Sequence, residues 1–158
     1  MKKWCIAIIS CLFLFLMGCG GNEANNELTG NNPPEASIQI DGETYETTLG
    51  TYCWSSKGKS ECVDTAGPKE LLEGKQPIQV KPGAEIKFVM DYKPLPNEVH
   101  VTQFDDSSEN EVNVEGNSFT APTEKGTYYY SYGVWWMDEE KENVSNGDAF
   151  YAFAIEVK

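Results

Sequence analysis

The sequence has no arginine and a single histidine, His100, against 25 acidic residues and a formal net charge of −13. Proteins that bind nucleic acids neutralise phosphates with lysine and arginine side chains, so the composition argues against nucleic acid as a partner. Anionic lipid headgroups should be repelled for the same reason, because polybasic segments are what draw a protein to them. The acidity is typical of a well-solvated, soluble exterior.

The motifs of common catalytic and metal sites are also missing. One imidazole cannot supply the two histidines of a blue-copper centre, and a structural zinc site needs four Cys or His ligands. A serine hydrolase would need His100 as its base, but no Gly-x-Ser-x-Gly motif accompanies it. No glycine-rich phosphate loop or dinucleotide fingerprint is present. We therefore expect no catalytic residue, no metal ligand and no cofactor, and keep a hydrolase only as a third hypothesis.

Two acidic loops leave one question about cations open. Asp105, Asp106, Glu109 and Glu111 crowd the first loop, and several acids occupy the second, at residues 138–148. Calcium prefers clustered carboxylate oxygens, but neither loop has the spacing and central glycine of a twelve-residue calcium loop. Solvated loops are the simpler interpretation, and a bound calcium ion is the alternative.

Long hydrophobic runs are absent except at the N-terminus, where Lys2 and Lys3 precede an apolar segment at residues 4–17. This arrangement is typical of an export signal, and the segment is shorter than the roughly 20 residues of a spanning helix. The sequence Leu16-Met17-Gly18-Cys19 resembles the lipobox of bacterial lipoproteins of the Gram-positive type. The resemblance implies cleavage after residue 18, a diacylglyceryl group on Cys19, and anchoring on the extracytoplasmic face of the cell membrane. A transmembrane anchor and a leader cut without lipidation are the alternatives.

The remaining chain divides into a tether and one domain. Residues 20–35 are rich in Gly, Asn and Glu, end in Pro33-Pro34, and have too little apolar surface to fold. We predict a signal peptide at residues 1–18, a lipidated Cys19 with a flexible tether over residues 19–35, and a domain over residues 36–158.

Within that domain, hydrophobic and polar residues alternate with a period of two, the pattern of half-buried strands. The clearest examples are residues 85–92, 126–136 and 149–157, the last two rich in aromatic and β-branched residues. The only helical candidate is a short turn at residues 68–73, where Pro68 suits the first helical position. Seven to nine short antiparallel strands with one helical turn predict an all-β sandwich.

The segment Pro122-Thr123-Glu124-Lys125-Gly126-Thr127-Tyr128 resembles the Pro-x-x-x-Gly-x-Tyr entry to the penultimate strand of immunoglobulin-like and fibronectin type III domains. The resemblance implies an immunoglobulin-like β-sandwich with Tyr128 as its corner tyrosine. The cysteine pair of this chain is local and does not bridge two sheets as in that family, so the strand order stays open. The whole chain resembles small lipoproteins of Gram-positive-type bacteria, a resemblance that does not indicate any particular activity.

Cys53 and Cys62 are the two cysteines that remain outside the leader and the lipobox. Outside the cell a disulfide between them would persist, and we predict that it crosses a hairpin with a polar turn at residues 56–60. Closing a loop of about ten residues contributes roughly 2.7 kcal/mol to stability in the chain-entropy estimate. A redox pair is the alternative, but the spacing lacks the Cys-x-x-Cys geometry that lowers a thiol pKa.

The aromatic residues at 128–136 supply the candidate binding site. Tyr130, Tyr132 and Trp136 lie on one face of their strand, whereas Tyr129 and Trp135 lie on the opposite face. Exposed aromatic rings stack on sugars or anchor protein interfaces. The alternative is that a covering loop or Trp54 packs over them. The candidate binding residues are Trp135, Tyr129 and Trp54, with the acidic loop after Trp136 as a rim.

Together these features predict a lipid-anchored, extracytoplasmic and non-catalytic binding or accessory module for an exported protein or a cell-wall glycan. The alternative is an inhibitor or regulator of a secreted enzyme that presents Lys57-Gly58-Lys59 at the tip of the disulfide-braced hairpin. Bracing such a tip would lower the entropy lost on binding.

Overall fold

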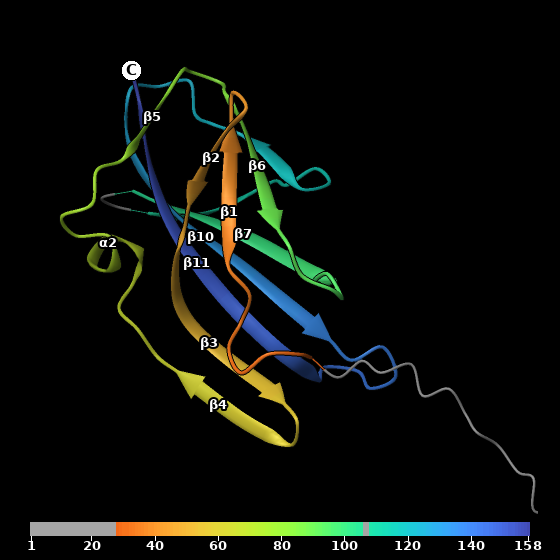
Figure 1. The fold of residues 1–158 in the computed structure, drawn as a ribbon. Helices are drawn as coiled ribbons and strands as arrows, with labels where there is room; N and C mark the ends of the chain where they lie inside the picture. The colour runs from red at the N-terminus through yellow and green to blue at the C-terminus, as the bar shows by residue number, and fades with distance from the viewer. Residues whose placement is uncertain (1–27, 106–107) are drawn as a thin grey trace, which may run out of the picture.

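The computed structural model describes residues 28–105 and 108–158, and these residues form two packed β-sheets with one short helix (Figure 1). The smaller sheet has four strands. In spatial order they are β2 (Glu43–Glu46), β1 (Ala36–Ile40), β6 (Glu85–Met90) and β9 (Ser118–Thr120).

The larger sheet has seven strands and contains the longest ones. Its main path is β4 (Lys59–Val63), β3 (Thr48–Ser56), β11 (Ser145–Val157), β10 (Gly126–Met137), β7 (Glu98–Phe104) and β8 (Glu109–Val112). Strand β5 (Ile78–Val80) pairs in parallel with the end of β11. The short helix α2 (Pro68–Leu71) lies in the connection between β4 and β5.

The predicted all-β sandwich with one helical turn is confirmed. The described residues contain eleven strands rather than the predicted seven to nine. Four of the strands are short, since β2, β5, β8 and β9 have only three or four residues each. A period of two is a weak signal over so few residues, and pairing with a neighbour defines the bounds of these strands.

The connectivity resolves the strand order that the sequence left open. Strands β6 and β9 are neighbours in one sheet and β7, β10 and β11 are neighbours in the other. Strands B and E, and strands C, F and G, have these relations in immunoglobulin-like sandwiches. The hydroxyl of Tyr128, at the start of β10, donates a hydrogen bond of 3.0 Å to the carbonyl of Glu124, as a corner tyrosine does. Strands β1–β4 precede this core and extend both sheets.

Stacked aromatic rings join the two sheets at the centre of the core. Phe88 of β6 lies face to face with Tyr132 of β10, with 3.8 Å between ring centroids and 4° between planes. Phe88 also contacts Phe119 and Phe153, and Phe153 stacks on Tyr130. Burial raises the pKa of Tyr132 to about 12, so its hydroxyl stays neutral.

At one end of the core, three aromatic side chains enclose the start of the described chain. Trp54 packs edge to face against Trp136 at 5.0 Å and against Tyr92 at 5.8 Å. The Trp54 indole donates a hydrogen bond to the carbonyl of Gly30, and the backbone N–H of Thr29 donates one to the Tyr92 hydroxyl. Leu28 is only 2% exposed.

Leu28, the first described residue, is thus already packed into the core, although the predicted tether reached residue 35. Leu28 is the one large apolar residue in a polar segment, so composition averaged over that segment conceals it. The predicted signal peptide at residues 1–18 and the lipidation site Cys19 lie outside the described residues. In the part of the chain that the structure describes, no helix has the length and apolar character needed to span a membrane.

Candidate functional site

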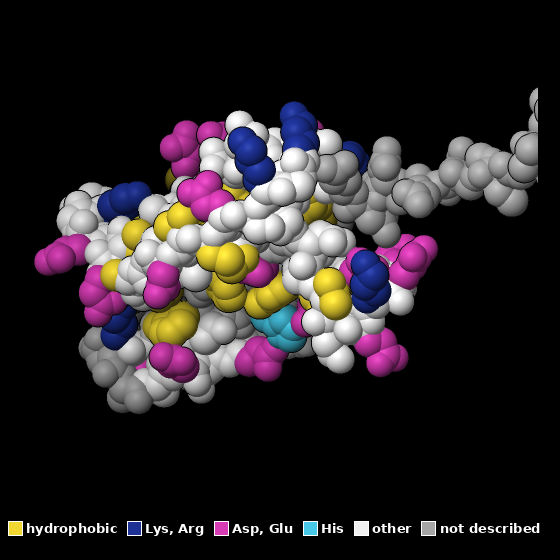
Figure 2. All heavy atoms as spheres, turned by 90° about the horizontal axis from the view of Figure 1, so that it is seen from below, with side chains coloured by type: hydrophobic (Ala, Val, Ile, Leu, Met, Phe, Trp, Pro, Cys, Tyr) yellow, Lys and Arg dark blue, Asp and Glu magenta, His cyan; other side chains and the backbone are white. Residues whose placement is uncertain are grey.

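The outer face of the larger sheet carries two of the three aromatic residues predicted as a binding site. Along β10, Tyr130, Tyr132, Val134 and Trp136 are buried toward the smaller sheet. Tyr129 and Trp135 therefore point the other way, and both are half-buried. The predicted facing of these two residues is confirmed, and Figure 2 shows hydrophobic side chains in a band across one face of the molecule, with the histidine at its margin.

Trp54 does not belong to this face. It is 2% exposed and packs between the sheets, so its inclusion among the binding residues was wrong. It does not cover Tyr129 and Trp135 either, because it lies on the inner side of the sheet. In β3 it is Tyr52, Trp54 and Ser56 that are buried, while Cys53 and Ser55 face outward. Aromatic, cysteine and serine residues mix in this segment, so the sequence pattern does not determine which face is inside.

Trp135 lies over a glycine and between two other rings. The side chain contacts Phe150 at 5.2 Å and His100 at 5.4 Å, both edge to face. A Cβ atom on Gly133 would lie 2.8 Å from Trp135 Cη2, so only glycine lets the indole lie this close to the strand. Trp135 and Phe150 thus form a partly exposed aromatic pair.

Tyr129 stands apart from that pair. It is six residues from Trp135 along β10, which corresponds to about 20 Å of strand. Its ring lies 5.8 Å from Nζ of Lys69, which projects from helix α2. The predicted cluster is therefore two separate positions at opposite ends of one sheet face.

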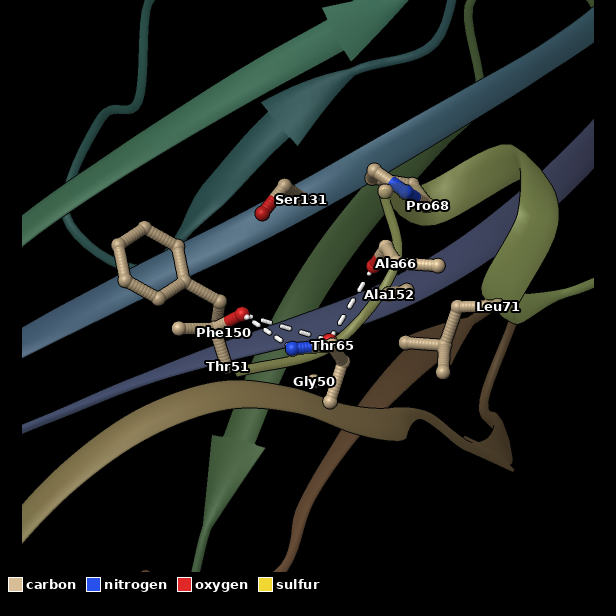
Figure 3. A pocket seen from close by; sticks show the side chains of 10 residues that line it. Gly50, Thr51, Thr65, Ala66, Pro68, Leu71, Ser131, Phe150 and Ala152 are labelled. Carbon is tan, nitrogen blue, oxygen red and sulfur yellow. Dashed lines mark hydrogen bonds between the residues drawn. The ribbon is translucent and has the colours of Figure 1, made fainter. Parts of the chain in front are cut away.

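Between these two positions the outer face is hollowed by a pocket of about 270 Å³ (Figure 3). Its floor consists of the small residues Gly50, Ser131 and Ala152 on three neighbouring strands. The connection through Thr65, Ala66, Pro68 and Leu71 forms one wall, and the ring of Phe150 stands at the other side.

The pocket is mainly apolar, and one of its walls packs closely against Gly50 in the floor. A Cβ atom on Gly50 would lie 3.3 Å from Leu71 Cδ2, Thr65 Oγ1 and the Phe150 carbonyl oxygen, so the connection packs closely over this glycine. The hydroxyls of Thr51 and Thr65 lie 3.3 Å apart and hydrogen-bond to each other. Their polarity is thus partly satisfied within the wall, which leaves an apolar cavity suited to a small hydrophobic group.

Sequence reasoning missed this pocket. Its residues come from β3, the β4–β5 connection, β10 and β11, and no local motif joins them. The one available signal is Gly50 within a strand pattern, because such a glycine often marks close approach of another backbone or a ligand.

His100 lies beside Trp135 and between two glutamate side chains. Its Nδ1 lies 2.9 Å from Glu111 Oε1 and its Nε2 lies 3.1 Å from Glu98 Oε1. Each ring nitrogen is therefore engaged by a carboxylate. The hydrogen bonds that the protonated ring donates to Glu111 and then to Glu98 raise the pKa of His100 above its usual 6.5, because they favour the charged ring.

The raised pKa of His100 can be measured by NMR titration of its ring protons. We expect a midpoint above 6.5 in the wild type and a lower one in Glu111→Gln. Because the folded state favours the protonated ring, this contribution to stability is present below pH 6.5 and is lost as pH rises through the folded-state pKa. Glu109→Gln, on the same strand without a His100 contact, should leave the midpoint in place. A wild-type midpoint at or below 6.5 would contradict this arrangement.

The predicted disulfide between Cys53 and Cys62 is confirmed, and it crosses the hairpin formed by β3 and β4. Pairing continues from the cysteines to Ser56 and Lys59, which leaves a two-residue turn. The turn residues Lys57 and Gly58 have φ of 52° and 72°, the left-handed conformation typical of a tight hairpin turn. The tip is therefore a compact turn rather than an extended loop.

Replacing both cysteines by serine is expected to lower the free energy of unfolding by roughly 2.7 kcal/mol, because the unfolded chain regains the entropy of the opened loop. Urea denaturation of Cys53→Ser/Cys62→Ser beside the oxidised wild type measures this. The wild type treated with a reductant is the matched control and should lose a similar amount. Equal urea midpoints for all three samples would show that the bond contributes nothing.

Each acidic loop has one aspartate that accepts hydrogen bonds from within the same loop. Asp138 Oδ1 accepts the backbone N–H groups of Glu140 and Lys141 at 2.9 and 3.0 Å. Asp105 Oδ1 similarly accepts the N–H of Ser108 at 2.8 Å. Across residues 28–105 and 108–158, no three His, Cys, Asp or Glu side chains gather in a way that could hold a metal ion.

Comparison with protein-family models, curated proteins and solved structures gave no significant match. The fold and the geometry of the site are therefore the basis for the function considered below.

Proposed function

We propose that this protein is a lipid-anchored, extracytoplasmic and non-catalytic binding module. The pocket beside Phe150 would receive an apolar group of an exported protein, and Trp135 would pack against the same partner. The observation that carries the proposal is an apolar pocket of about 270 Å³ next to a partly exposed aromatic pair. Aromatic residues and well-formed apolar pockets are the usual centres of binding energy in protein interfaces.

The lining of the pocket favours a protein partner over a glycan. Phe150, Leu71 and Pro68 offer apolar contacts, while the hydroxyls of Thr51 and Thr65 already bond to each other. A sugar ring presents several hydroxyls that need polar partners once they lose water. A cell-wall glycan is therefore the alternative ligand, bound through stacking on Trp135 alone.

The binding experiment uses the purified domain on a resin and two separate probes. The first is the mixture of proteins released from the cell surface, and the second is a suspension of purified peptidoglycan. We expect the wild type to retain a specific surface protein that Phe150→Ala and Trp135→Ala do not retain. Leu95→Ala is the matched control, because Leu95 is an exposed large apolar residue that does not line this pocket.

Two outcomes would reject this site. Equal capture by wild type, Phe150→Ala and Trp135→Ala would show that the outer face does not take part in binding. Sedimentation with peptidoglycan that depends on Trp135 but not on Phe150 would establish the glycan alternative instead.

The anchoring part of the proposal depends on the sequence at residues 16–19. Mass spectrometry of the native protein tests it directly. We expect an N-terminal Cys19 carrying a diacylglyceryl group, and release of Cys19→Ala from the membrane fraction. Two acyl chains hold a protein durably at a bilayer, whereas one is marginal. An unmodified Cys19 or a retained leader would reject the anchor.

The second candidate function is inhibition of a secreted enzyme by the hairpin tip. The disulfide-braced β3–β4 hairpin lies at the edge of the larger sheet and is exposed along β4, so a partner enzyme could contact it. Because Lys57 and Gly58 form a tight turn, the tip would not bind an enzyme as an extended, substrate-like strand. Assays against a panel of secreted proteases, with Lys59→Ala beside the wild type, would test this candidate.

A further inference from the structure

A second hollow lies at the smaller sheet and shares no lining residue with the pocket described above. It is a groove of about 630 Å³ lined by β1, β2 and β6, by the segment that enters β1, and by Leu49 and Tyr151 of the larger sheet. This volume is within the range of specific ligand sites. Pro33 and Pro34 line it, and the hydroxyl of Tyr151 donates a hydrogen bond of 2.6 Å to the Pro34 carbonyl.

Two large apolar side chains in this groove are exposed to solvent. Leu49, at the start of β3, is 36% exposed, and Val89, on β6, is 38% exposed. They are two of only four large hydrophobic residues in the described chain that are this exposed, and both line the same groove. A shared position in one hollow distinguishes them from scattered apolar surface residues.

The charged groups of the groove are all of one sign. Glu35, Glu46 and Asp91 line it, and among the described residues no lysine does. Lys87 lies on the same outward side of β6, two residues from Val89, but outside the groove. An apolar floor with a carboxylate rim attracts a ligand that is both cationic and hydrophobic, because carboxylates steer and orient positive groups toward the buried contacts.

We propose that this groove binds an extended peptide segment of an exported protein in which lysine or arginine alternates with apolar residues. Strand β2 is the edge of its sheet at this groove, which suits a partner in extended conformation. The other available occupants lack the required charge. A second copy carries −13 overall, residues 20–27 contain Glu23 and Glu27 without a lysine, and an anionic membrane would be repelled. The proposal is independent of the pocket beside Phe150.

The test measures fluorescence anisotropy of a labelled Lys-Leu-Lys-Leu-Lys peptide with the domain at low ionic strength. The comparison peptides are Glu-Leu-Glu-Leu-Glu, which reverses the charge, and Lys-Ser-Lys-Ser-Lys, which removes the apolar side chains. We expect binding of the first peptide only. The double variant Glu46→Gln/Asp91→Asn should weaken it by about five- to tenfold, the size typical of two exposed ion pairs.

The matched control is Glu61→Gln/Glu70→Gln, which changes the net charge equally at exposed positions outside the groove. We expect less than about a twofold change, since charges beyond the Debye length are screened. Leu49→Ser and Val89→Ser should each weaken binding, and Lys87→Gln should strengthen it. Equal losses of affinity in the two double variants would show that net charge alone causes the effect, and would overturn the proposal. Absence of binding, or binding indifferent to Leu49 and Val89, would also overturn it, and none of these results bears on the Phe150 pocket.

Discussion

Replacing Trp54 by alanine is expected to lower the free energy of unfolding by roughly 3–5 kcal/mol, the range for truncating a buried aromatic side chain. Trp54 is 2% exposed and contacts Trp136 and Tyr92 edge to face. Its loss would also leave the Gly30 carbonyl without the indole N–H and uncover Leu28, whose Cδ1 lies close to Gly147 beside the Trp54 ring. Urea denaturation followed by far-ultraviolet circular dichroism measures the change.

Trp135→Ala is the matched control, because it removes the same side chain from the outer face of the same sheet. Trp135 is half-buried, so we expect less than half of the Trp54 effect on stability. Trp54→Phe should fall in between, since a ring still fills most of the space while the hydrogen bond to Gly30 is lost. Similar losses for Trp54→Ala and Trp135→Ala would contradict the placement of Trp54 in the core.

Phe88→Ala should be equally damaging, with a loss of roughly 3–5 kcal/mol, because Phe88 links the two sheets. Its ring lies 3.8 Å from Tyr132 and also contacts Phe119 and Phe153, so alanine leaves a cavity that three neighbouring rings cannot fill. Single domains have only about 5–15 kcal/mol of stability in total. We therefore expect a large fall in the thermal midpoint, measured by calorimetry.

Val89→Ala controls for the position in the strand, because Val89 is the next residue of β6 and faces outward. It is 38% exposed, and its truncation should change stability by less than about 1 kcal/mol. A small effect for Phe88→Ala, comparable to that of Val89→Ala, would show that the sheets are not joined through this stack of rings.

Each sheet of the domain thus has an inner face for stability and an outer face with its own hollow. On β10, Trp136 belongs to the core and its neighbour Trp135 to the surface. On β6, Phe88 belongs to the core and Val89 to the acidic groove. Stability and binding can therefore be altered separately by substitutions at adjacent positions, which makes the proposed sites accessible to experiment.

The sequence by itself determined what depends on local pattern. Alternation assigned the faces of Tyr129 and Trp135 correctly, and the entry motif before Tyr128 pointed to the corner hydrogen bond with Glu124. The spacing of Cys53 and Cys62 around a polar turn gave the hairpin and its disulfide. These features need only neighbours along one strand or one turn, so the two-residue period and the turn residues are sufficient to define them.

Tertiary structure alone decided what depends on distant segments. Trp54 lies in a stretch of mixed residue types, and the pairing of β3 with β11 determines which side of that stretch faces the core. Leu28 is buried because it packs against Trp54 and Gly147, which belong to two other strands. The pocket beside Phe150 and the acidic groove each bring together residues from several elements without a shared motif. Hollows form where small side chains and connections of separate strands meet. That depends on which strands become neighbours, and no single segment of the sequence encodes it.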